Sequence, residues 1–384
     1  MKSPIFSLSC RLTARNFTLT RRTILLGIVA GLSFVATPRA GADPLQQGQS
    51  AGNLVTPRAN HTANLLLDGR VLLAAGYDGT AETASAEFYN PATNSWRATG
   101  SLNQARYFHS SALLPDGRVL VAGGQTTGAN DLSSAEIYDP ATGRWTFTGN
   151  MLAPRAFFSM VLLPNGKVLA AGGNAFGYTT TAELYDPASG TWAATGDLNQ
   201  SRSNAHLTLL DDGQVLYAGG ASAEAELYDP DSGTWSVTGS LSIPRSENIQ
   251  VLLADGRVLV AGGSRAKSGG NFKILASTEV YDSSTGLWTG TGSLKTARRD
   301  FSGTLLSDGK VFAVGGSDAN TQTLGSIEEY DPATGKWKLL RESLSMPRAG
   351  HTATYLLNGD LIIAGGSAAF MPPIAEAELF VRPR

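Results

Sequence analysis

One phrase occurs seven times along this chain, and it limits the fold more than any other feature. Each copy begins with an arginine, at Arg58, Arg106, Arg155, Arg202, Arg245, Arg298 and Arg348, and neighbouring copies are 43 to 53 residues apart. A period in this range indicates units that bury their apolar faces against one another. The fold can therefore be predicted from a single unit.

The first half of each unit predicts a β-hairpin. An apolar run follows the arginine, and a turn pair separates it from a second apolar run, at Asp68-Gly69, Asp116-Gly117, Asn165-Gly166, Asp212-Gly213, Asp255-Gly256, Asp308-Gly309 and Asn358-Gly359. Such pairs favour a type I′ turn, in which both central residues have positive φ. The second run ends in two small residues, as at Gly123-Gly124, which permit close backbone approach.

The second half of each unit predicts two further strands. Residues 135–145 read AEIYDPATGRW, and close variants recur in the other units. Asp, Pro and Gly favour a turn here, because Asp bonds its own backbone, Pro fixes φ and Gly accepts positive φ. The tryptophan begins a fourth strand that leads to the next arginine. Seven such units predict an all-β fold, a seven-bladed β-propeller with four antiparallel strands in each blade.

The two ends of the repeat predict how the ring closes. The last unit stops before its tryptophan strand, whereas residues 52–58 align with residues 239–245, which end at Arg245. We therefore expect the N-terminal strand to complete the seventh blade and remove an open strand edge. Gly48 stands where other blades have tryptophan, so we expect looser packing in this blade.

The order Gly-Gly, Glu-x-Tyr-Asp-Pro, Trp and Arg resembles the kelch repeat of β-propellers. The resemblance covers about residues 52–380 and is to the galactose oxidase-like kelch superfamily, here of an exported bacterial type. It implies the propeller fold. It does not imply one function, because kelch propellers include enzymes, adaptors and carbohydrate-binding proteins.

Residues 1–42 are expected to be an export signal, and residues 43–384 the propeller. Basic residues up to Arg22 precede a short apolar run over 24–36, and the small residues at 40–42 suit cleavage before Asp43. The twin arginine resembles a Tat signal, with Sec export and a retained N-terminal anchor as alternatives. We expect a periplasmic or secreted protein with no membrane span after signal cleavage.

Loss of this segment would change the charge and the cysteine content of the chain. It holds six basic and no acidic residues, so the remainder has a net charge of −8, which argues against a nucleic-acid partner. Cys10 is the single cysteine. The mature chain is therefore expected to lack disulfides and thiolate ligands.

Most repeated polar and aromatic residues are expected to hold the blades together. The seven arginines and the glutamates of Glu-x-Tyr recur too regularly to form one active site, and buried charges need partners. The tryptophans are expected to pack between blades. His61, His109 and His351 each follow an arginine by three residues, which favours a structural role. Alternatively, this position converges around the axis and builds a metal or polar site.

Specificity is expected where the blades differ, in the two residues after each arginine and in the loop after each glycine pair. By resemblance to kelch propellers, both sets line one face around the central axis. The ligand-binding candidates are Tyr107, Phe108, His109, Phe157, Glu247, Arg299, Asp300, His61 and His351. The longest loop, residues 264–277, carries Arg265, Lys267, Phe272 and Lys273 and is expected to be either a lid or a plain surface loop.

Three functions are compatible with such a propeller, and we favour a binding module whose loop face holds a glycan, a peptide or a partner protein. The alternative is a cofactor-independent sugar enzyme resembling sialate mutarotases, with Glu247, Arg299 and Asp300 as acid–base groups, although those propellers are usually six-bladed. A copper oxidase like galactose oxidase is disfavoured, because Phe108 replaces the ligand tyrosine before His109 and no mature cysteine remains for its cross-link. We expect no metal, no cofactor and a monomer.

Overall fold

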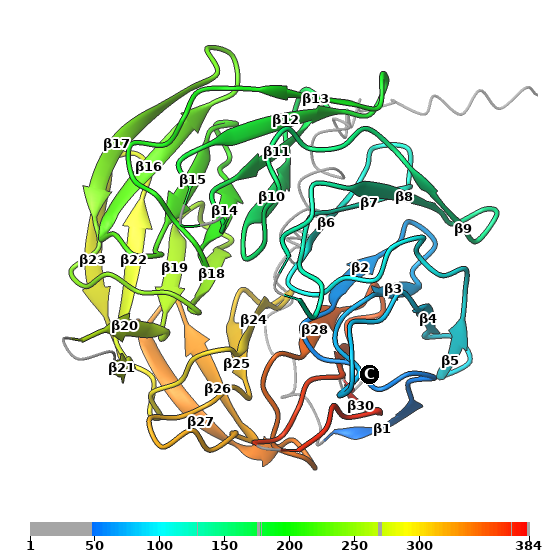
Figure 1. Cartoon of the computed structure of the whole chain (residues 1–384). Coiled ribbons are helices and arrows are strands. Elements are labelled where there is room, and N and C mark those ends of the chain that lie inside the picture. Colours follow the sequence, from blue (N-terminus) through cyan, green and yellow to red (C-terminus); the bar gives the residue numbers. More distant parts are fainter. Residues whose placement is uncertain are drawn as a thin grey trace, which may run out of the picture.

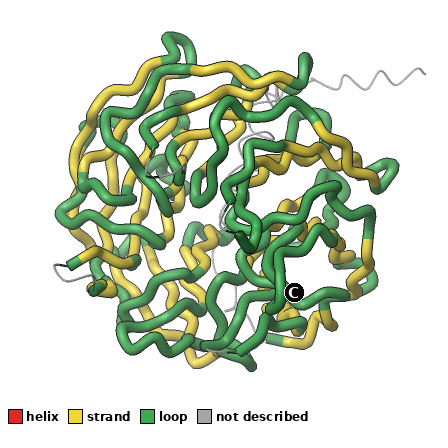
Figure 2. The backbone as a smooth tube through the Cα atoms, viewed as in Figure 1, coloured by secondary structure: helices red, strands yellow, loops and turns green. Residues whose placement is uncertain are grey.

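The computed structural model describes residues 48–128, 130–174, 177, 179–267, 271–369 and 371–381. The expected export signal, residues 1–42, lies outside the described residues. Within them, the chain forms strands, turns and loops (Figure 2). None of the described residues forms a helix long and apolar enough to cross a membrane.

Seven four-stranded antiparallel sheets stand around a central axis, as predicted (Figure 1). Blades 1 to 3 consist of β2 (Thr62–Leu65), β3 (Val71–Ala74), β4 (Ala86–Asn90) and β5 (Ser95–Ala98); β6 (Ser110–Leu113), β7 (Val119–Ala122), β8 (Ala135–Asp139) and β9 (Arg144–Phe147); and β10 (Ser159–Leu162), β11 (Val168–Ala171), β12 (Ala182–Asp186) and β13 (Thr191–Ala194). Blades 4 to 6 consist of β14 (His206–Leu209), β15 (Val215–Ala218), β16 (Glu224–Asp229) and β17 (Thr234–Ser240); β18 (Ile249–Leu252), β19 (Val258–Ala261), β22 (Thr278–Asp282) and β23 (Leu287–Thr291); and β24 (Ser302–Leu305), β25 (Val311–Val314), β26 (Ser326–Asp331) and β27 (Lys336–Ser343). A separate hairpin, β20 (Ser264–Ala266) and β21 (Phe272–Ile274), is inserted in blade 5.

The seventh blade is completed by the N-terminal strand, which confirms the predicted closure. It contains β28 (Thr352–Tyr355), β29 (Leu361–Ala364), β30 (Glu376–Phe380) and β1 (Gln49–Asn53). Gln49 lies opposite Leu379, so the two ends of the described chain are joined by one antiparallel ladder. Phe380 replaces the tyrosine of other blades, lies against Gly48 and is only 1% exposed. The looser packing expected in this blade is therefore not seen at Phe380.

The hairpin turns are present at all seven predicted positions, but the predicted turn type is wrong. In blade 1, the N–H of Gly69 donates to the carbonyl of Leu66 and the N–H of Leu66 donates to the carbonyl of Arg70. Gly69 has φ of 85°, whereas Asp68 is not among the residues with positive φ. This pattern is a three-residue loop, a type I turn followed by a left-handed glycine, and not a type I′ turn. The Asp68 carboxylate accepts from the N–H of Arg70, which stabilises the turn.

The hydrophobic core lies between neighbouring blades. One cluster joins Leu120 and Ile137 of blade 2 to Met160, Tyr185 and Trp192 of blade 3, and the other boundaries repeat the pattern. In the six blades that have both residues, the tryptophan packs on the tyrosine of its own blade with ring centroids 5.0 to 5.2 Å apart. The expected packing role of the tryptophans is therefore confirmed.

The repeated arginines and glutamates form seven buried ion pairs, which confirms their structural role. All seven arginines are 0% exposed. Their nitrogen-to-oxygen distances are 2.5 to 3.1 Å, in the pairs Arg58–Glu87, Arg106–Glu136, Arg155–Glu183, Arg202–Glu226, Arg245–Glu279, Arg298–Glu328 and Arg348–Glu378. Each pair also binds the backbone, as the second blade illustrates. Arg106 donates to the carbonyls of Gly123 and Ser134, and Glu136 accepts from the N–H groups of Asn103 and Gln104.

Candidate functional site

The innermost strands of the seven blades contact one another in a closed circle around the axis, in the order β2, β6, β10, β14, β18, β24 and β28 (Figure 1). The residue after each arginine lies just before such a strand. In six blades it forms an isolated β-bridge with the residue after the glycine pair, as Tyr107 does with Gln125. The two sets of variable positions therefore lie side by side on one face, as predicted.

The second residue after each arginine forms a ring of backbone hydrogen bonds, which we call the axial ring. Its members are Asn60, Phe108, Phe157, Asn204, Glu247, Asp300 and Gly350, and all have positive φ between 52° and 62°. Each N–H donates to the carbonyl of the preceding member, and Asn60 donates to Gly350, with distances of 2.9 to 3.3 Å. Hydrogen-bonded backbones lie about 4.8 Å apart, so seven steps close a ring about 11 Å across. Side chains from six blades thus come within reach of one ligand, and the seventh blade contributes Gly350, which has no side chain.

One side of the axial ring is aromatic. Tyr77, Tyr107, Phe108 and Phe157 form a continuous arc, with successive ring centroids 6.0, 4.7 and 4.1 Å apart. All four side chains are partly exposed. Burial, followed by the charge of Glu82, raises the pKa of the Tyr107 phenol above its ordinary value, so this hydroxyl is a hydrogen-bond donor at neutral pH. The arc offers apolar ring faces and one phenol to a ligand.

The other side of the axial ring is charged. Glu247, Arg299 and Asp300 form a cluster in which Nη1 of Arg299 lies 3.2 Å from Oε2 of Glu247, and its Nε lies 3.9 Å from Oδ2 of Asp300. Burial and the neighbouring Glu247 charge raise the pKa of Asp300 to about 6, although Arg299 opposes the shift. The Asp300 side chain is 43% exposed. This carboxyl can hold or release a proton near neutral pH.

The three candidate histidines lie between blades and bond neighbouring strands. Nε2 of His109 lies 2.9 Å from Oγ1 of Thr62, Nε2 of His61 lies 3.1 Å from Oγ1 of Thr352, and Nε2 of His351 lies 2.9 Å from Oγ of Ser302. All three side chains are buried. Burial lowers the pKa of His109 and of His351 to about 3, and lowers that of His61 well below 6.5. These contacts support the structural interpretation of the histidines.

The histidine contacts belong to a second set of bonds between blades. The residue four after the arginine bonds the next blade through its side chain: Ser110 accepts from the N–H of Met160, and Ser159 accepts from the N–H of Leu207. In blade 5 this residue is Ile249, whose side chain packs against Gly303 of the next blade. The sequence does not predict these contacts, although the frequent hydroxyl at this position is a signal that could have indicated them.

His206 and Tyr77 extend the candidate site beyond the predicted residues. His206 occupies the fourth position after Arg202, is exposed, and has its Nε2 2.9 Å from the carbonyl oxygen of Asn248. Tyr77 follows the glycine pair of blade 1 and continues the arc at Tyr107. The sequence could have indicated Tyr77 through its position in a variable loop, but it could not have indicated the ring contact with Tyr107, which depends on the spacing between blades.

The donor set does not fit a copper centre. His109 has its Nε2 bonded to Thr62, and Phe108 provides no ligand atom. Among the described residues, no three His, Cys, Asp or Glu side chains are gathered as a metal would require. We therefore derive no chemistry through a metal ion.

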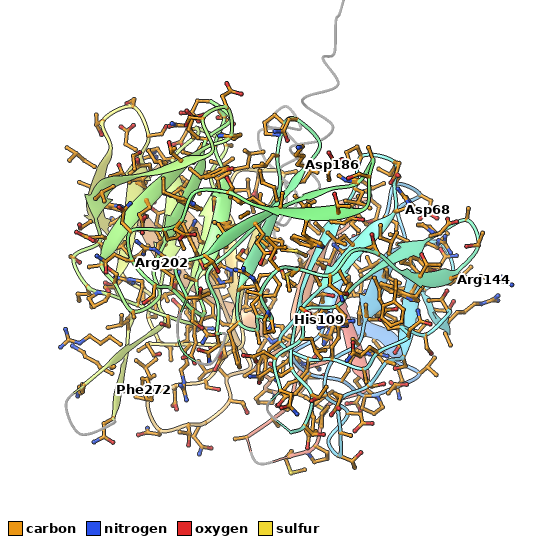
Figure 3. The ribbon with its side chains drawn as sticks, turned by 45° about the horizontal axis from the view of Figure 1, so that its top comes forward. Asp68, His109, Arg144, Asp186, Arg202 and Phe272 are labelled. Atoms are coloured by element: carbon orange, nitrogen blue, oxygen red, sulfur yellow. The ribbon has the colours of Figure 1, made fainter. Side chains whose placement is uncertain are left out.

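A groove of about 520 Å³ lies away from these residues, at the hairpin turns of blades 3 and 4. It is lined by Leu162, Leu163, Pro164, Asn165, Leu209, Leu210, Asp211, Asp212, Gly213, Gln214, Asp229, Pro230 and Asp231. In Figure 3, the turn residues Asp68 and Asp186 lie toward the top, and Phe272 projects at the bottom. The axial ring precedes each innermost strand and the hairpin turn follows it, so the turns and the axial ring occupy opposite faces of the propeller.

Comparison with known proteins identifies the repeat. Residues 106–152 and 298–343 match the Kelch motif. Two F-box/kelch-repeat proteins of Arabidopsis thaliana are similar to part of the chain, at 38% identity over 102 residues (26% of each chain) and 30% over 74 residues (19% of this chain and 27% of the relative). The aligned region is about a quarter of the length of these relatives.

A solved structure supports the fold alone. It is a fungal alcohol oxidase of the AA5 family in complex with copper, which superposes with a TM-score of 0.70 at 20% identity, over 89% of this chain and 76% of that one. The sequence matches, the solved structure and the seven blades lead to one conclusion: this chain is a seven-bladed β-propeller that carries Kelch motifs.

Proposed function

We propose that the protein is an exported binding module whose axial ring binds a glycan. One observation carries the proposal: the ring divides into an aromatic arc and a charged cluster that face a common axis. Ligand sites combine apolar and aromatic surface with a few polar groups that fix orientation. A sugar has the matching chemistry, because its C–H face packs on aromatic rings and its hydroxyls bond carboxylates and amides.

The residues of the axial ring that lie between the aromatic arc and the charged cluster favour a sugar over an apolar peptide segment as the ligand. Asn60 and Asn204 add side-chain amides, each of which both donates and accepts hydrogen bonds. Glu247 and Asp300 add carboxylate acceptors, and charge-assisted hydrogen bonds are among the stronger ones. A peptide or a partner protein is the competing ligand, and the test below separates the two.

The test is binding to a glycan panel, followed by titration calorimetry of the strongest ligand with variants. Phe157→Ala is expected to weaken binding about tenfold or more, since burying a phenyl side chain is worth about 1.5–3 kcal/mol. Phe147→Ala is the matched control, because Phe147 is 57% exposed on the outer strand β9. Equal affinity of the two variants, or binding to peptides alone, would contradict the proposal.

The export proposal has its own test. Its support is the basic and apolar pattern of residues 1–42, with small residues before Asp43. Mass spectrometry of the protein recovered outside the cytoplasm is expected to find a chain that begins at Asp43. Recovery of the full chain in the cytoplasm would contradict export but would leave glycan binding standing.

A second function is favoured by the raised pKa of Asp300 beside Glu247. A carboxyl that titrates near neutral pH can act as a general acid or base, and the alternative is therefore acid–base catalysis on the bound sugar, such as opening of a reducing sugar ring. The test is NMR exchange spectroscopy of anomers of reducing sugars with and without protein. Faster exchange that Asp300→Asn abolishes would support catalysis, whereas unchanged exchange would leave a binding module alone.

A further inference from the structure

The β20–β21 hairpin is the one element of the described chain that is added to the four-stranded blades. It joins the charged cluster at its base, where Ser264 pairs with Ser246 and donates its hydroxyl to Oε2 of Glu247 at 2.8 Å. The guanidinium of Arg299 lies 5.9 Å from the ring centroid of Phe272 on β21. The hairpin therefore borders the axial ring, and Figure 3 shows Phe272 projecting from that face.

The hairpin carries three cations, Arg265, Lys267 and Lys273. Arg265 on β20 lies directly opposite Lys273 on β21, and Lys267 follows β20. Like charges opposite each other across two strands destabilise a hairpin. No carboxylate of the described residues forms an ion pair with any of the three cations. Nε of Arg265 is buried, and no described residue forms a hydrogen bond with it.

The nearest charged groups of the site do not relieve this repulsion. Oε2 of Glu247 already accepts from Ser264 and from Arg299. Asp300 lies beside Arg299. The cations of the hairpin thus remain available to an external anion, which would replace a repulsive arrangement by charge-assisted hydrogen bonds.

We propose that the glycan bound by this protein is an acidic polysaccharide. Arg265 and Lys273 alternate along β20 and β21 with Ser264 and Phe272, which contact the charged cluster, so the two cations lie on the other face of the hairpin. There they bind carboxylates of sugars beyond the one that packs on the aromatic arc. The inference rests on the proposed function, because the arc and the axial ring supply the sugar contacts. A polymer suits the site better than a single sugar, since the cation pair and the arc are separate contact regions. A chain of uronic acid residues has a carboxylate on each sugar.

The experiment compares two polymers with the same backbone, polygalacturonate and its methyl ester, by calorimetry at low and high salt. The acid form is expected to bind about tenfold more tightly at low salt, because hydrogen bonds to charged groups are worth about 1.5–3 kcal/mol. Added salt should reduce that preference, since exposed charges are screened. The double variant Arg265→Gln, Lys273→Gln should abolish the preference without weakening binding of the ester.

Matched controls separate the inference from the function on which it rests. Arg144→Gln, Lys336→Gln removes two exposed cations at the turn face and should keep the preference for the acid form. Equal binding of acid and ester, both weakened by Phe157→Ala, would overturn the acidic class and keep glycan binding. No binding of either polymer, with poly-glutamate bound instead, would overturn both. Binding of polygalacturonate that the hairpin variant leaves unchanged would also overturn the inference.

Discussion

Removing the Arg106 guanidinium and the Glu136 carboxylate together is expected to destabilise the protein as severely as removing the arginine alone. An ordinary buried ion pair behaves differently, because replacing both partners by apolar side chains is often neutral. This pair also satisfies two backbone carbonyls and two backbone N–H groups, at distances of 2.7 to 3.0 Å. It fixes the backbone just before Tyr107 and Phe108, which belong to the aromatic arc.

The magnitude follows from the groups that each variant leaves without a partner. Arg106→Met leaves the Glu136 carboxylate buried without its counter-ion, a loss of about 3–5 kcal/mol, and leaves the Gly123 carbonyl without its donor, a further loss of about 1–3 kcal/mol. Arg106→Met, Glu136→Leu removes that charge but leaves the Gly123 carbonyl and the N–H groups of Asn103 and Gln104 without their partner, whereas the Ser134 carbonyl still accepts from the N–H of Gly123. At about 1–3 kcal/mol for each of the three groups, the double variant loses about 3–9 kcal/mol. Replacing both charged residues by apolar ones therefore does not restore the stability that is lost in Arg106→Met.

Urea unfolding followed by tryptophan fluorescence measures these free energies. The control is Arg70→Met, which breaks an ion pair with Asp68 that is partly exposed to solvent and should change the free energy of unfolding by less than about 1 kcal/mol. A double variant that unfolds at the same urea concentration as the wild type would refute the backbone role of the pair. Failure of the double variant to fold, with Arg70→Met unaffected, agrees with it.

Three further outcomes follow from the contacts between blades. The pKa of His109 is about 3 in the folded protein and about 6.5 in the unfolded chain. The unfolded chain therefore binds a proton first, and the free energy of unfolding falls as the pH drops below 6.5. The thermal midpoint of the variant His109→Phe should fall less between pH 7 and pH 5 than that of the wild type. The pKa of Asp300 is raised to about 6, so its contribution to stability is lost as the pH rises from about 4 to about 6. Over that range the thermal midpoint of the variant Asp300→Asn should rise relative to that of the wild type. A constant difference between the two thermal midpoints would contradict the raised pKa. Gly303→Ala places a Cβ 2.7 Å from Cδ1 and 2.8 Å from Cβ of Ile249 and should cost about 1–3 kcal/mol in urea unfolding. Because Ile249→Ala keeps that Cβ, the double variant Ile249→Ala, Gly303→Ala should not recover the loss.

The sequence predicts the architecture because every unit repeats the same strand and turn signals. Even the closure of the seventh blade follows from aligning residues 52–58 with an internal repeat. The turn type does not follow, because Asp-Gly occurs both in type I′ turns and in longer loops with a left-handed glycine. The hydrogen bond from Leu66 to Arg70 distinguishes them, and it depends on a one-residue difference in loop length.

The candidate site follows from the sequence only in outline. The variable positions after each arginine identify the face, and Phe108, Phe157, Glu247 and Asp300 do lie in the axial ring. The ring has only a partial sequence signal: Asn60, Asn204, Asp300 and Gly350 are residue types that favour positive φ, whereas Phe108, Phe157 and Glu247 are not. Its geometry arises from the spacing of neighbouring blades, which no single unit encodes.

The most direct test of glycan binding at the axial ring is a crystal structure of the protein with the tightest ligand of the glycan panel. The predicted result is a sugar ring packed on Phe108 and Phe157, with hydroxyls bonded to Glu247 or Asp300. A ligand found in the groove between Asp211 and Asp231 on the opposite face, with the axial ring empty, would contradict the account.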